Sequence, residues 1–442
     1  MSPRKAAATN RPAATISAAR FVCSGCSLLC DDLTGTTNTG CVAADRWFAS
    51  GTDRPVTTID RQPATIDESV NAAAHRLASA RRVLVTGLTS LPLEAIRLAC
   101  QIAERLTAAV DAGTADTSLL TGPTIARVGE VTAAFEELRD RADLVIFWGC
   151  DPAASHPRFI ERFVHPTRPN GDRRTISLGP QPVLPAAANH LHLPLKPDLF
   201  IAAARLLQAS IKGYSTEPAE GPLAAVVSEL KAAIDAASCI GIVSSTMTDP
   251  TGLTGWSLAQ LVRALAHRKP AFQIRLGAGT ADGGGNTAGV AASSTWRYGA
   301  PGAIAAADRD GSEFQPAEAD AVRLISRGEV DCVLAVGRLA PRLEAALVAT
   351  TTPPVTIRIT DVAPASAAAT AVVLGTASLP QNTAGIMLRE DGRATQLTPI
   401  EAPKHLTVEH VLEQLLQAIE TAGEDMQQID VTTQPAFPSG NA

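Results

Sequence analysis

Residues 142–152 read ADLVIFWGCDP and contain an unbroken apolar run, Leu144 to Trp148, that ends at a glycine. A short apolar run closed by a turn residue is typical of a strand buried on both faces of a parallel sheet. Three similar runs occur nearby: RRVLVTGL at 81–88, TISLGP at 175–180 and HLHLPL at 190–195. The first of them is followed by LPLEAIRLACQIAERL, which has helical spacing. This alternation predicts a first α/β domain with a mainly parallel sheet over residues 61–205.

A second series of strands predicts a second α/β domain over residues 206–400. Its apolar runs are ASCIGIVSS at 237–245, AFQIRLG at 271–277, VDCVLAVGRL at 330–339, PVTIRIT at 354–360 and TAVVLGTA at 370–377. The fold class expected is therefore multi-domain α/β, with two doubly wound, mainly parallel sheets. We expect a disordered arm at 1–20, a small cysteine lobe at 21–60, and a C-terminal helix with a disordered tail at 401–442.

Composition excludes several classes of protein. A chain of 442 residues is too long for one ordinary core, and a net charge of −6 without any Lys/Arg-rich run argues against a nucleic-acid partner. No apolar stretch reaches the length of about 18 residues that a membrane span needs. The N-terminal segment lacks the apolar region of a signal peptide, so we expect a cytoplasmic protein without membrane contact.

Four of the eight cysteines form a metal-binding pattern. Cys23, Cys26 and Cys30 read C-x2-C-x3-C, and Cys41 follows. Clustered thiolates in a cytoplasmic protein favour a soft metal, and both zinc and a [4Fe–4S] cluster take four cysteines. The spacing does not choose between them, and four unconnected reduced cysteines are the alternative. The other cysteines in apolar runs, Cys100, Cys239 and Cys332, are expected in the core.

The turn after the Leu144–Trp148 run is a candidate ligand site, because α/β sheets bind ligands beyond the carboxyl ends of their strands. Gly149, Cys150, Asp151 and His156 lie in this turn. The alternative is an ordinary loop with an N-cap and a surface histidine.

The segment GAGTADGGGNTAG, residues 277–289, is glycine-rich and follows another strand. It lacks the ending of a P-loop, so it is a weak dinucleotide signature. Glycine lets a backbone approach a ligand or another chain closely, and a mobile surface loop is the alternative. Neither a nucleophile elbow nor an HExxH motif supports a hydrolase.

Three segments in this order resemble the B subunit of formylmethanofuran dehydrogenase, one of the molybdopterin or tungstopterin oxidoreductases. They are CSGCSLLCDDL at 23–33, RADLVIFWGCDPAASHPRF at 141–159, and N-x2-G-x6-W-x2-G-x-P, here Asn286, Gly289, Trp296, Gly299 and Pro301. The resemblance covers residues from about 20 to 400. It implies a molybdopterin-oxidoreductase-like fold.

In the family's redox form the cysteines hold a [4Fe–4S] cluster, and two pterins hold tungsten or molybdenum. The resemblance assigns contacts near the pterins to the following residues, retained here as a vestige: Gly122, Pro123, Gly149, Asp151, His156, Asn286 and Gly289. The family's metal takes a Cys or selenocysteine, but the matching position here is Leu120, followed by Thr121. Leucine has no lone pair to offer a metal. The glycine-rich segment also lacks the Arg and His of the family.

These departures lead to two hypotheses. In the first, the chain is the non-redox, structural B subunit of a formyltransferase/hydrolase complex with A, C and D subunits. Those partners would act on a formylmethanofuran-type cofactor and formyl-tetrahydromethanopterin in C1 metabolism, and this chain would have no catalytic centre and no metal-pterin. Its cysteines would then hold a structural cluster or zinc, or stay empty. In the second, the chain is a working dehydrogenase subunit that interconverts CO2 or formate and formylmethanofuran.

Overall fold

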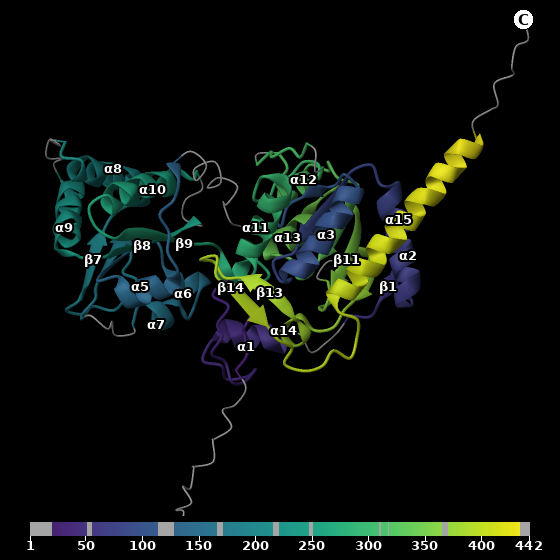
Figure 1. Cartoon of the computed structure of the whole chain (residues 1–442), viewed down its shortest axis with the longest axis horizontal. Coiled ribbons are helices and arrows are strands. Elements are labelled where there is room, and N and C mark those ends of the chain that lie inside the picture. Colours follow the sequence, from purple (N-terminus) through teal and green to yellow (C-terminus); the bar gives the residue numbers. More distant parts are fainter. Residues whose placement is uncertain are drawn as a thin grey trace, which may run out of the picture.

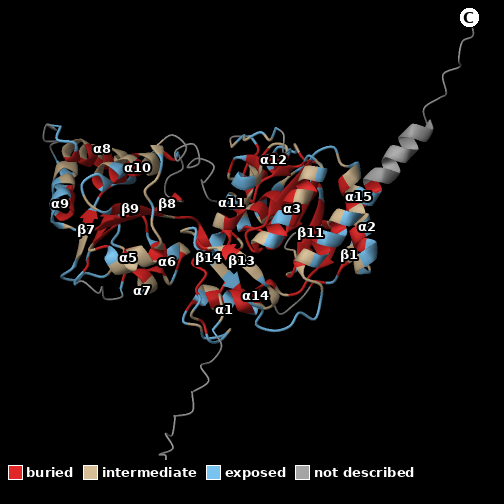
Figure 2. Ribbon diagram, viewed as in Figure 1, coloured by how far each residue is buried: buried red, intermediate tan, exposed pale blue. Residues whose placement is uncertain are grey.

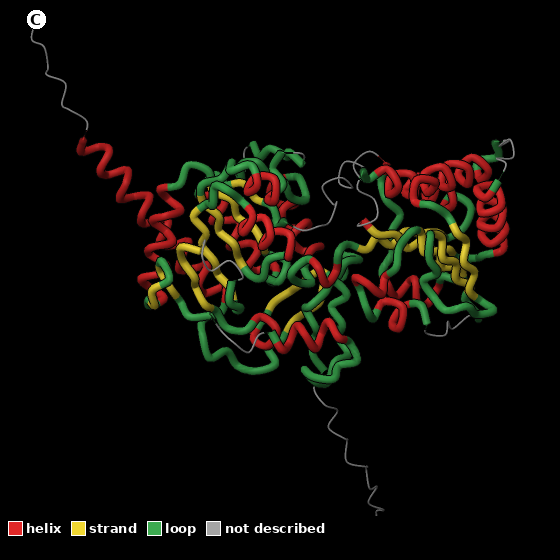
Figure 3. The backbone as a smooth tube through the Cα atoms, turned by 180° about the vertical axis from the view of Figure 1, so that it is seen from behind, coloured by secondary structure: helices red, strands yellow, loops and turns green. Residues whose placement is uncertain are grey.

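The computed structural model of the chain describes residues 20–50, 55–113, 128–165, 171–214, 221–246, 251–308, 311–316, 318–364 and 370–433, with side chains up to residue 422. Two α/β units lie beside each other, and each is built around one sheet (Figure 1). Seen from behind, the strands of the two units form two separate groups (Figure 3). The fold class expected from the sequence is confirmed.

The smaller unit contains a five-stranded sheet in which all neighbouring strands are parallel. The strand order is β7-β6-β5-β8-β9, with the fold-defining run Leu144–Trp148 at its centre as β5. Its other strands are β6 (Arg174–Gly179), β7 (His190–Pro194), β8 (Ile240–Ser245) and β9 (Ala271–Leu276). Strands β6 and β7 lie on one side of β5, and β8 and β9 lie on the other. The turn after β5 therefore lies at a switch point, where α/β folds bind ligands.

Helices cover both faces of this sheet, which explains why β5 has no polar residue. One face packs against three helices: α8 (Phe200–Ile211, after the short turn η1, Pro197–Leu199), α9 (Pro222–Ala236) and α10 (Leu253–Ala266). The other face packs against α5 (Phe135–Arg141) and α7 (Phe159–Phe163), with the short α6 (Pro152–Ser155) before α7. Figure 2 shows the strands buried between these layers.

The larger unit contains a seven-stranded sheet in the order β2-β1-β12-β11-β10-β3-β4. Five neighbouring strands are parallel, and the short β1 and β2 add an antiparallel edge. The strands are β1 (Thr58–Ile59), β2 (Gln62–Pro63), β3 (Val83–Gly87), β4 (Ala109–Val110), β10 (Cys332–Val336), β11 (Val355–Thr360) and β12 (Thr370–Gly375). Its switch point lies between β3 and β10.

The helices of this unit also form two layers. One layer contains α2 (Ile66–Ser79), α3 (Leu93–Arg105), α11 (Thr287–Tyr298) and α15 (Val408–Thr433). The other layer contains α12 (Ala321–Ser326) and α13 (Pro341–Ala349). A capping box at Thr65 and Glu68 starts α2, because the Thr65 hydroxyl accepts from the Glu68 N–H and Glu68 accepts from the Thr65 N–H.

The division of the chain into consecutive domains at residue 205 differs from the structure. Residues 83–110 share a sheet with residues 332–375, whereas residues 144–194 share the other sheet with residues 240–276. The five-stranded unit is therefore an insertion within the seven-stranded unit. Each apolar run became the expected strand, but a local pattern carries no information about which distant strand will pair with it.

The two segments that pass between the units lie side by side on the inserted unit. The Gln273 N–H donates to the Val131 carbonyl at 2.8 Å, and the Arg275 guanidinium binds the Glu130 carboxylate at 2.7 and 2.9 Å. A two-point bond of this kind fixes orientation as well as distance. The pair therefore holds the entering and leaving segments in one register.

The cysteine lobe is shorter than expected. Its described residues, 20–50, include α1 (Val42–Ala49), whereas Thr58 and Ile59 already belong to the seven-stranded sheet as β1. The hairpin of β13 (Gly385–Leu388) and β14 (Ala394–Leu397) follows the small helix α14 (Leu379–Asn382). In Figure 1 the hairpin lies at the junction of the two units, and the lobe lies below it.

The expected helix near the C-terminus is present as α15. The expected N-terminal arm, apart from residue 20, and the tail after residue 433 lie outside the described residues. No helix in the described ranges is both long and apolar enough to cross a membrane.

Arg389 joins the hairpin to the inserted unit. Its guanidinium, 4% exposed, bonds to the carboxylates of Glu136 and Asp391 and lies 4.8 Å from the centre of the Phe135 ring. The Asp391 carboxylate in turn accepts from the Phe135 N–H at 2.7 Å. The hydrogen bonds from Arg389 lower the pKa of Glu136 to about 2.

We predict that Arg389→Met lowers the free energy of unfolding by about 3 kcal/mol, because it leaves two carboxylates without their shared cation in a partly buried site. Arg393→Met is the matched control, since Arg393 also pairs with Glu136 but is half exposed, and its loss should cost about 0–1 kcal/mol. Urea unfolding of both variants measures the difference. Equal losses in the two variants would contradict the role of Arg389 as a clamp.

Candidate functional site

The candidate site lies where the two switch points face the cysteine lobe. Four loops meet there: the cysteine loop, the turn after β5, the turn after β3, and the glycine-rich segment that leads into α11. The structure brings together the candidate residues of the cysteine loop, those of the turn after β5, and Asn286. The candidate ligand-binding segment Ser118–Thr124, with Leu120, Gly122 and Pro123, lies outside the described residues.

The four cysteines of the N-terminal pattern are free, buried and arranged around one small cavity of about 10 Å³. The cysteine loop is closed by a hydrogen bond from the Cys23 N–H to the Cys30 carbonyl at 2.8 Å. Four soft sulfur donors facing one enclosed space fit the ligand chemistry of an iron–sulfur cluster or zinc.

The cysteines are not placed to hold a single metal ion. Zinc needs its thiolates at about 2.3 Å from one point. Within the ranges that the structure describes, no group of three or more His, Cys, Asp or Glu side chains is arranged to hold one metal ion. The cysteines therefore surround a common space without forming a ready single-ion site.

Burial keeps the thiols of Cys23, Cys26 and Cys30 protonated. Desolvation raises the pKa of Cys23 to about 12 and raises that of Cys26 well above its ordinary value. Burial also raises the pKa of Cys30, although the nearby Arg162 opposes this change. Thiolates are the metal-binding form, so loading this site with metal would release protons.

Two arginines at the start of α7 fix the cysteine lobe in place: Arg158, which precedes the helix, and Arg162, within it. Arg158 binds the Asp32 carboxylate through two hydrogen bonds of 2.8 Å, and Arg162 binds Asp31 at 2.6 Å. Arg158 also lines the cysteine cavity. The acidic pair that follows Cys30 is thus the docking element of the lobe.

His156 is completely buried between the lobe and the turn, not on the surface. Its Nε2 lies 2.7 Å from the Ser27 hydroxyl, and its Nδ1 lies 2.8 Å from the Ser155 hydroxyl. Burial lowers the pKa of His156 to about 4, so the ring is neutral at pH 7. Both ring nitrogens are therefore used within the chain, and the ring carries no charge for a phosphate.

The other residues of this turn also have structural roles. Gly149 has a φ of +60°, and a Cβ there would lie 2.2 Å from the Phe200 ring, so only glycine fits. Asp151 is exposed and caps α6, accepting from the Ala153 N–H at 2.9 Å. Cys150 is buried, and desolvation raises the pKa of its thiol, which makes it a poor nucleophile.

Asn286 ties three parts of the larger unit together. Its Nδ2 donates to the Leu91 carbonyl at 2.7 Å, its Oδ1 accepts from the Leu388 N–H at 2.8 Å, and its N–H donates to the Thr89 carbonyl at 2.7 Å. A Cβ on Gly289 would lie 2.0 Å from the Asn286 Oδ1, so this glycine makes room for the amide.

The glycine-rich segment is packed into the molecule. A Cβ on Gly284 would lie 2.4 Å from the Ser90 Cα, and one on Gly285 would lie 2.6 Å from the Cys26 carbonyl oxygen. The glycines thus allow the loop to pass between the cysteine loop and the turn after β3. The close approach expected from the sequence is present, and the neighbour is another part of the same chain.

Sequence reasoning missed the buried ion pair of Arg338 and Asp361. Arg338 follows β10, Asp361 follows β11, and their side chains bond at 2.6 and 3.0 Å. The Arg338 guanidinium also lies 4.1 Å from the Trp47 ring and donates to the Ser50 hydroxyl at 2.7 Å. The signal in the sequence was a charged residue just beyond each apolar strand: Asp361 directly after β11, and Arg338 two positions after the end of β10.

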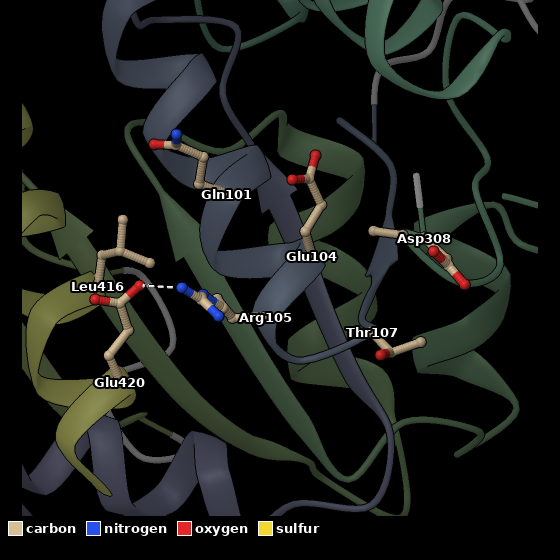
Figure 4. Close-up of a pocket in the computed structure, with 8 residues that line it drawn as sticks. Gln101, Glu104, Arg105, Thr107, Asp308, Leu416 and Glu420 are labelled. Carbon is tan, nitrogen blue, oxygen red and sulfur yellow. Dashed lines mark hydrogen bonds and ion pairs between the residues drawn. The ribbon is translucent and has the colours of Figure 1, made fainter. Parts of the chain in front are cut away.

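A separate polar pocket of about 460 Å³ lies away from the junction, between α3 and α15 (Figure 4). Its charged side chains are largely paired: Arg105 binds Glu420 at 2.6 Å, and Glu104 binds Arg297. This pairing leaves few free groups for a ligand.

We predict that His156 makes stability depend on pH. The unfolded chain takes up a proton on this histidine below about pH 6.5, whereas the folded chain does so only near pH 4. Stability from this group is complete above pH 6.5 and is lost as the pH falls toward 4, by roughly 3 kcal/mol in all.

The test compares urea unfolding of the wild type and His156→Gln at pH 7 and pH 4.5. The stability advantage of the wild type should shrink by about 2–3 kcal/mol at the lower pH. His75→Gln, at an exposed position on α2, is the control and should show no such change. If the stability advantage of the wild type over His156→Gln did not change with pH, His156 would not be a buried neutral ring.

The sequence and the structure of this chain were compared with those of known proteins. No protein-family model matches the sequence. The chain is 29% identical over 223 residues to the B subunit of tungsten-containing formylmethanofuran dehydrogenase 2 from Methanococcus maripaludis, covering 44% of this chain and 50% of that protein. It is 26% identical over 160 residues to the protein of the same name from Methanocaldococcus jannaschii, covering 34% and 36%. The matches thus span half or less of these relatives.

A solved structure shows the same fold over most of the chain. It is a chain of the formyltransferase/hydrolase complex FhcABCD from Methylorubrum extorquens, determined with methylofuran, with a TM-score of 0.69 and 23% identity. The match covers 84% of this chain and 100% of that one. Over part of its length this chain is therefore similar in sequence to the B subunit of formylmethanofuran dehydrogenase, and it has the fold of a chain from the formyltransferase/hydrolase complex.

Proposed function

We propose that this chain is the non-redox, structural B subunit of a cytoplasmic formyltransferase/hydrolase complex. Partner subunits would move the formyl group from formyl-tetrahydromethanopterin to a methanofuran-type carrier and release it as formate. The chain itself would carry no metal-pterin. Its contribution would be to hold the partner subunits in place.

The observation that carries this proposal is the use of the pterin-site residues inside the chain. Both ring nitrogens of His156 and both side-chain polar atoms of Asn286 bond to protein groups. A cofactor phosphate or ring needs donors that point into a cavity, and both side chains are fully buried. Leu120 at the expected metal-ligand position supports the same conclusion from the sequence.

A second candidate is a working formylmethanofuran dehydrogenase subunit. The four cysteines around one enclosed space favour it, because a buried cluster serves electron transfer when a redox metal lies nearby. The curated relatives are tungsten-containing dehydrogenase subunits, which points the same way.

Metal analysis of the purified complex distinguishes the two functions. We expect less than about a tenth of an equivalent of tungsten or molybdenum per chain, together with formylmethanofuran hydrolysis but no viologen reduction. Stoichiometric tungsten or molybdenum with dye reduction would instead establish the dehydrogenase.

We also propose that the cysteine site, where filled, holds a structural cluster. The lobe of about 30 described residues is too small for a core of its own, and metal ligation would stabilise it. The spacing of the four cysteines in the sequence is compatible with a [4Fe–4S] cluster.

We predict that Cys23→Ser lowers the iron content and the absorbance near 400 nm severalfold, and lowers the urea midpoint, because it removes one of four ligands. Cys332→Ala is the control, since Cys332 is equally buried but lies in β10, away from the set. Iron and zinc analysis of the wild type comes first. A metal-free wild type whose stability falls no further in Cys23→Ser than in Cys332→Ala would refute the structural cluster.

A further inference from the structure

Trp296 is the most exposed large apolar side chain in the described part of the structure, at 91%. It lies near the C-terminal end of α11, a helix at the side of the larger unit that faces the junction (Figure 1). Trp47 and Trp148 are both buried. An indole is the largest apolar surface that one residue can offer a partner, so a tryptophan that is almost fully exposed to solvent needs an explanation.

The exposed side of α11 is free of charge. Ala292, Thr295 and Gly299 are exposed around Trp296, and the helix has only one charged residue, Arg297. Arg297 bonds twice to Glu104, at 2.6 and 2.7 Å, and both side chains are only 14% exposed. An exposed helix face normally carries charged residues for solubility. This one, which we call the Trp296 face, lacks them.

The other side of α11 is held firmly. Val290 and Tyr298 are buried in the main core, and the Tyr298 hydroxyl donates to the Cys100 carbonyl at 3.2 Å. Gly299 ends the helix with a φ of +78°. Trp296 therefore projects from a rigid support, and binding through it would cost little conformational entropy.

We infer that the Trp296 face docks another subunit of the complex, and that the indole is the central anchor of this interface. The inference rests on the proposed function. Interface cores are depleted of charge and enriched in tryptophan, as this face is. A different subunit is the occupant because the solved chain with this fold comes from a multi-subunit complex and is matched over its whole length. The chemistry of the face requires an uncharged, apolar pocket on that subunit, so the contact should withstand high salt.

The test is co-expression with the A, C and D subunits of the formyltransferase/hydrolase complex, followed by purification at 0.1 and 1 M NaCl. Trp296→Asp should weaken association about thirtyfold at both salt concentrations, as expected for a hot-spot residue. Tyr214→Asp is the matched control, because Tyr214 is an aromatic residue that is 68% exposed but lies beyond α8 on the other unit. Circular dichroism and urea midpoints of the isolated variants confirm that both are folded.

A direct readout is the fluorescence of Trp296, obtained as the difference between the wild type and Trp296→Phe. Iodide should quench it in the isolated chain, whereas in the complex it should be protected and shifted to shorter wavelength. If the wild type assembles, but Trp296→Asp assembles equally well and Trp296 stays open to iodide, the inference fails and the proposed function stands. If the isolated chain forms dimers that Trp296→Asp dissociates, the face binds a second copy and the inference is wrong. If the wild type does not assemble with these subunits, the proposed function fails and the inference fails with it.

Discussion

A fully buried hydrogen bond between Ser27 and His156 joins the cysteine lobe to the inserted unit, and the rest of the junction is arranged around it. The lobe has no core of its own. Its cysteines, Trp47 and Phe48 share a core with one face of the five-stranded sheet, while Leu29 packs with Met387 and Leu397 of the hairpin. The Glu390 N–H also donates to the Ser27 carbonyl. The lobe thus packs against both units and links them.

This arrangement explains how residues typical of a cofactor site serve a structural purpose. A buried polar group must be paired, but protein groups can satisfy it as well as a ligand can. His156 and Asn286 are paired with serine hydroxyls and backbone groups, and the glycine-rich loop fills the space between the cysteine loop and Ser90. The atoms that the family resemblance assigns to a cofactor site therefore hold the loops together.

The sequence predicted the elements well and their assembly less well. Runs such as those in β5, β8 and β10 became buried strands, because a wholly apolar segment has few alternatives in an α/β protein. The insertion of one unit in the other was not predicted, since it depends on pairing between β3 and β10, almost 250 residues apart.

The candidate site was predicted in part for the same reason. Motif spacing pointed to four cysteines and to the turn after β5, and the structure places these segments side by side. It could not show that His156 is buried, because that depends on Ser27 from a distant loop, nor that Arg338 meets Asp361 across two strand ends. Side-chain partners follow from tertiary contacts, which a single sequence does not display.

The nesting of the two units has a consequence for synthesis on the ribosome. All five strands of the inserted unit are made by residue 276, so this unit can fold while the rest is still being translated. Strand β3 must wait for β10, and until then only the two-residue β4 can pair with it. The cysteine lobe emerges before both sheets, yet its core partners extend to Leu276. Its thiols therefore pass through a long nascent stage in contact with solvent, the period in which metal insertion or oxidation has the freest access.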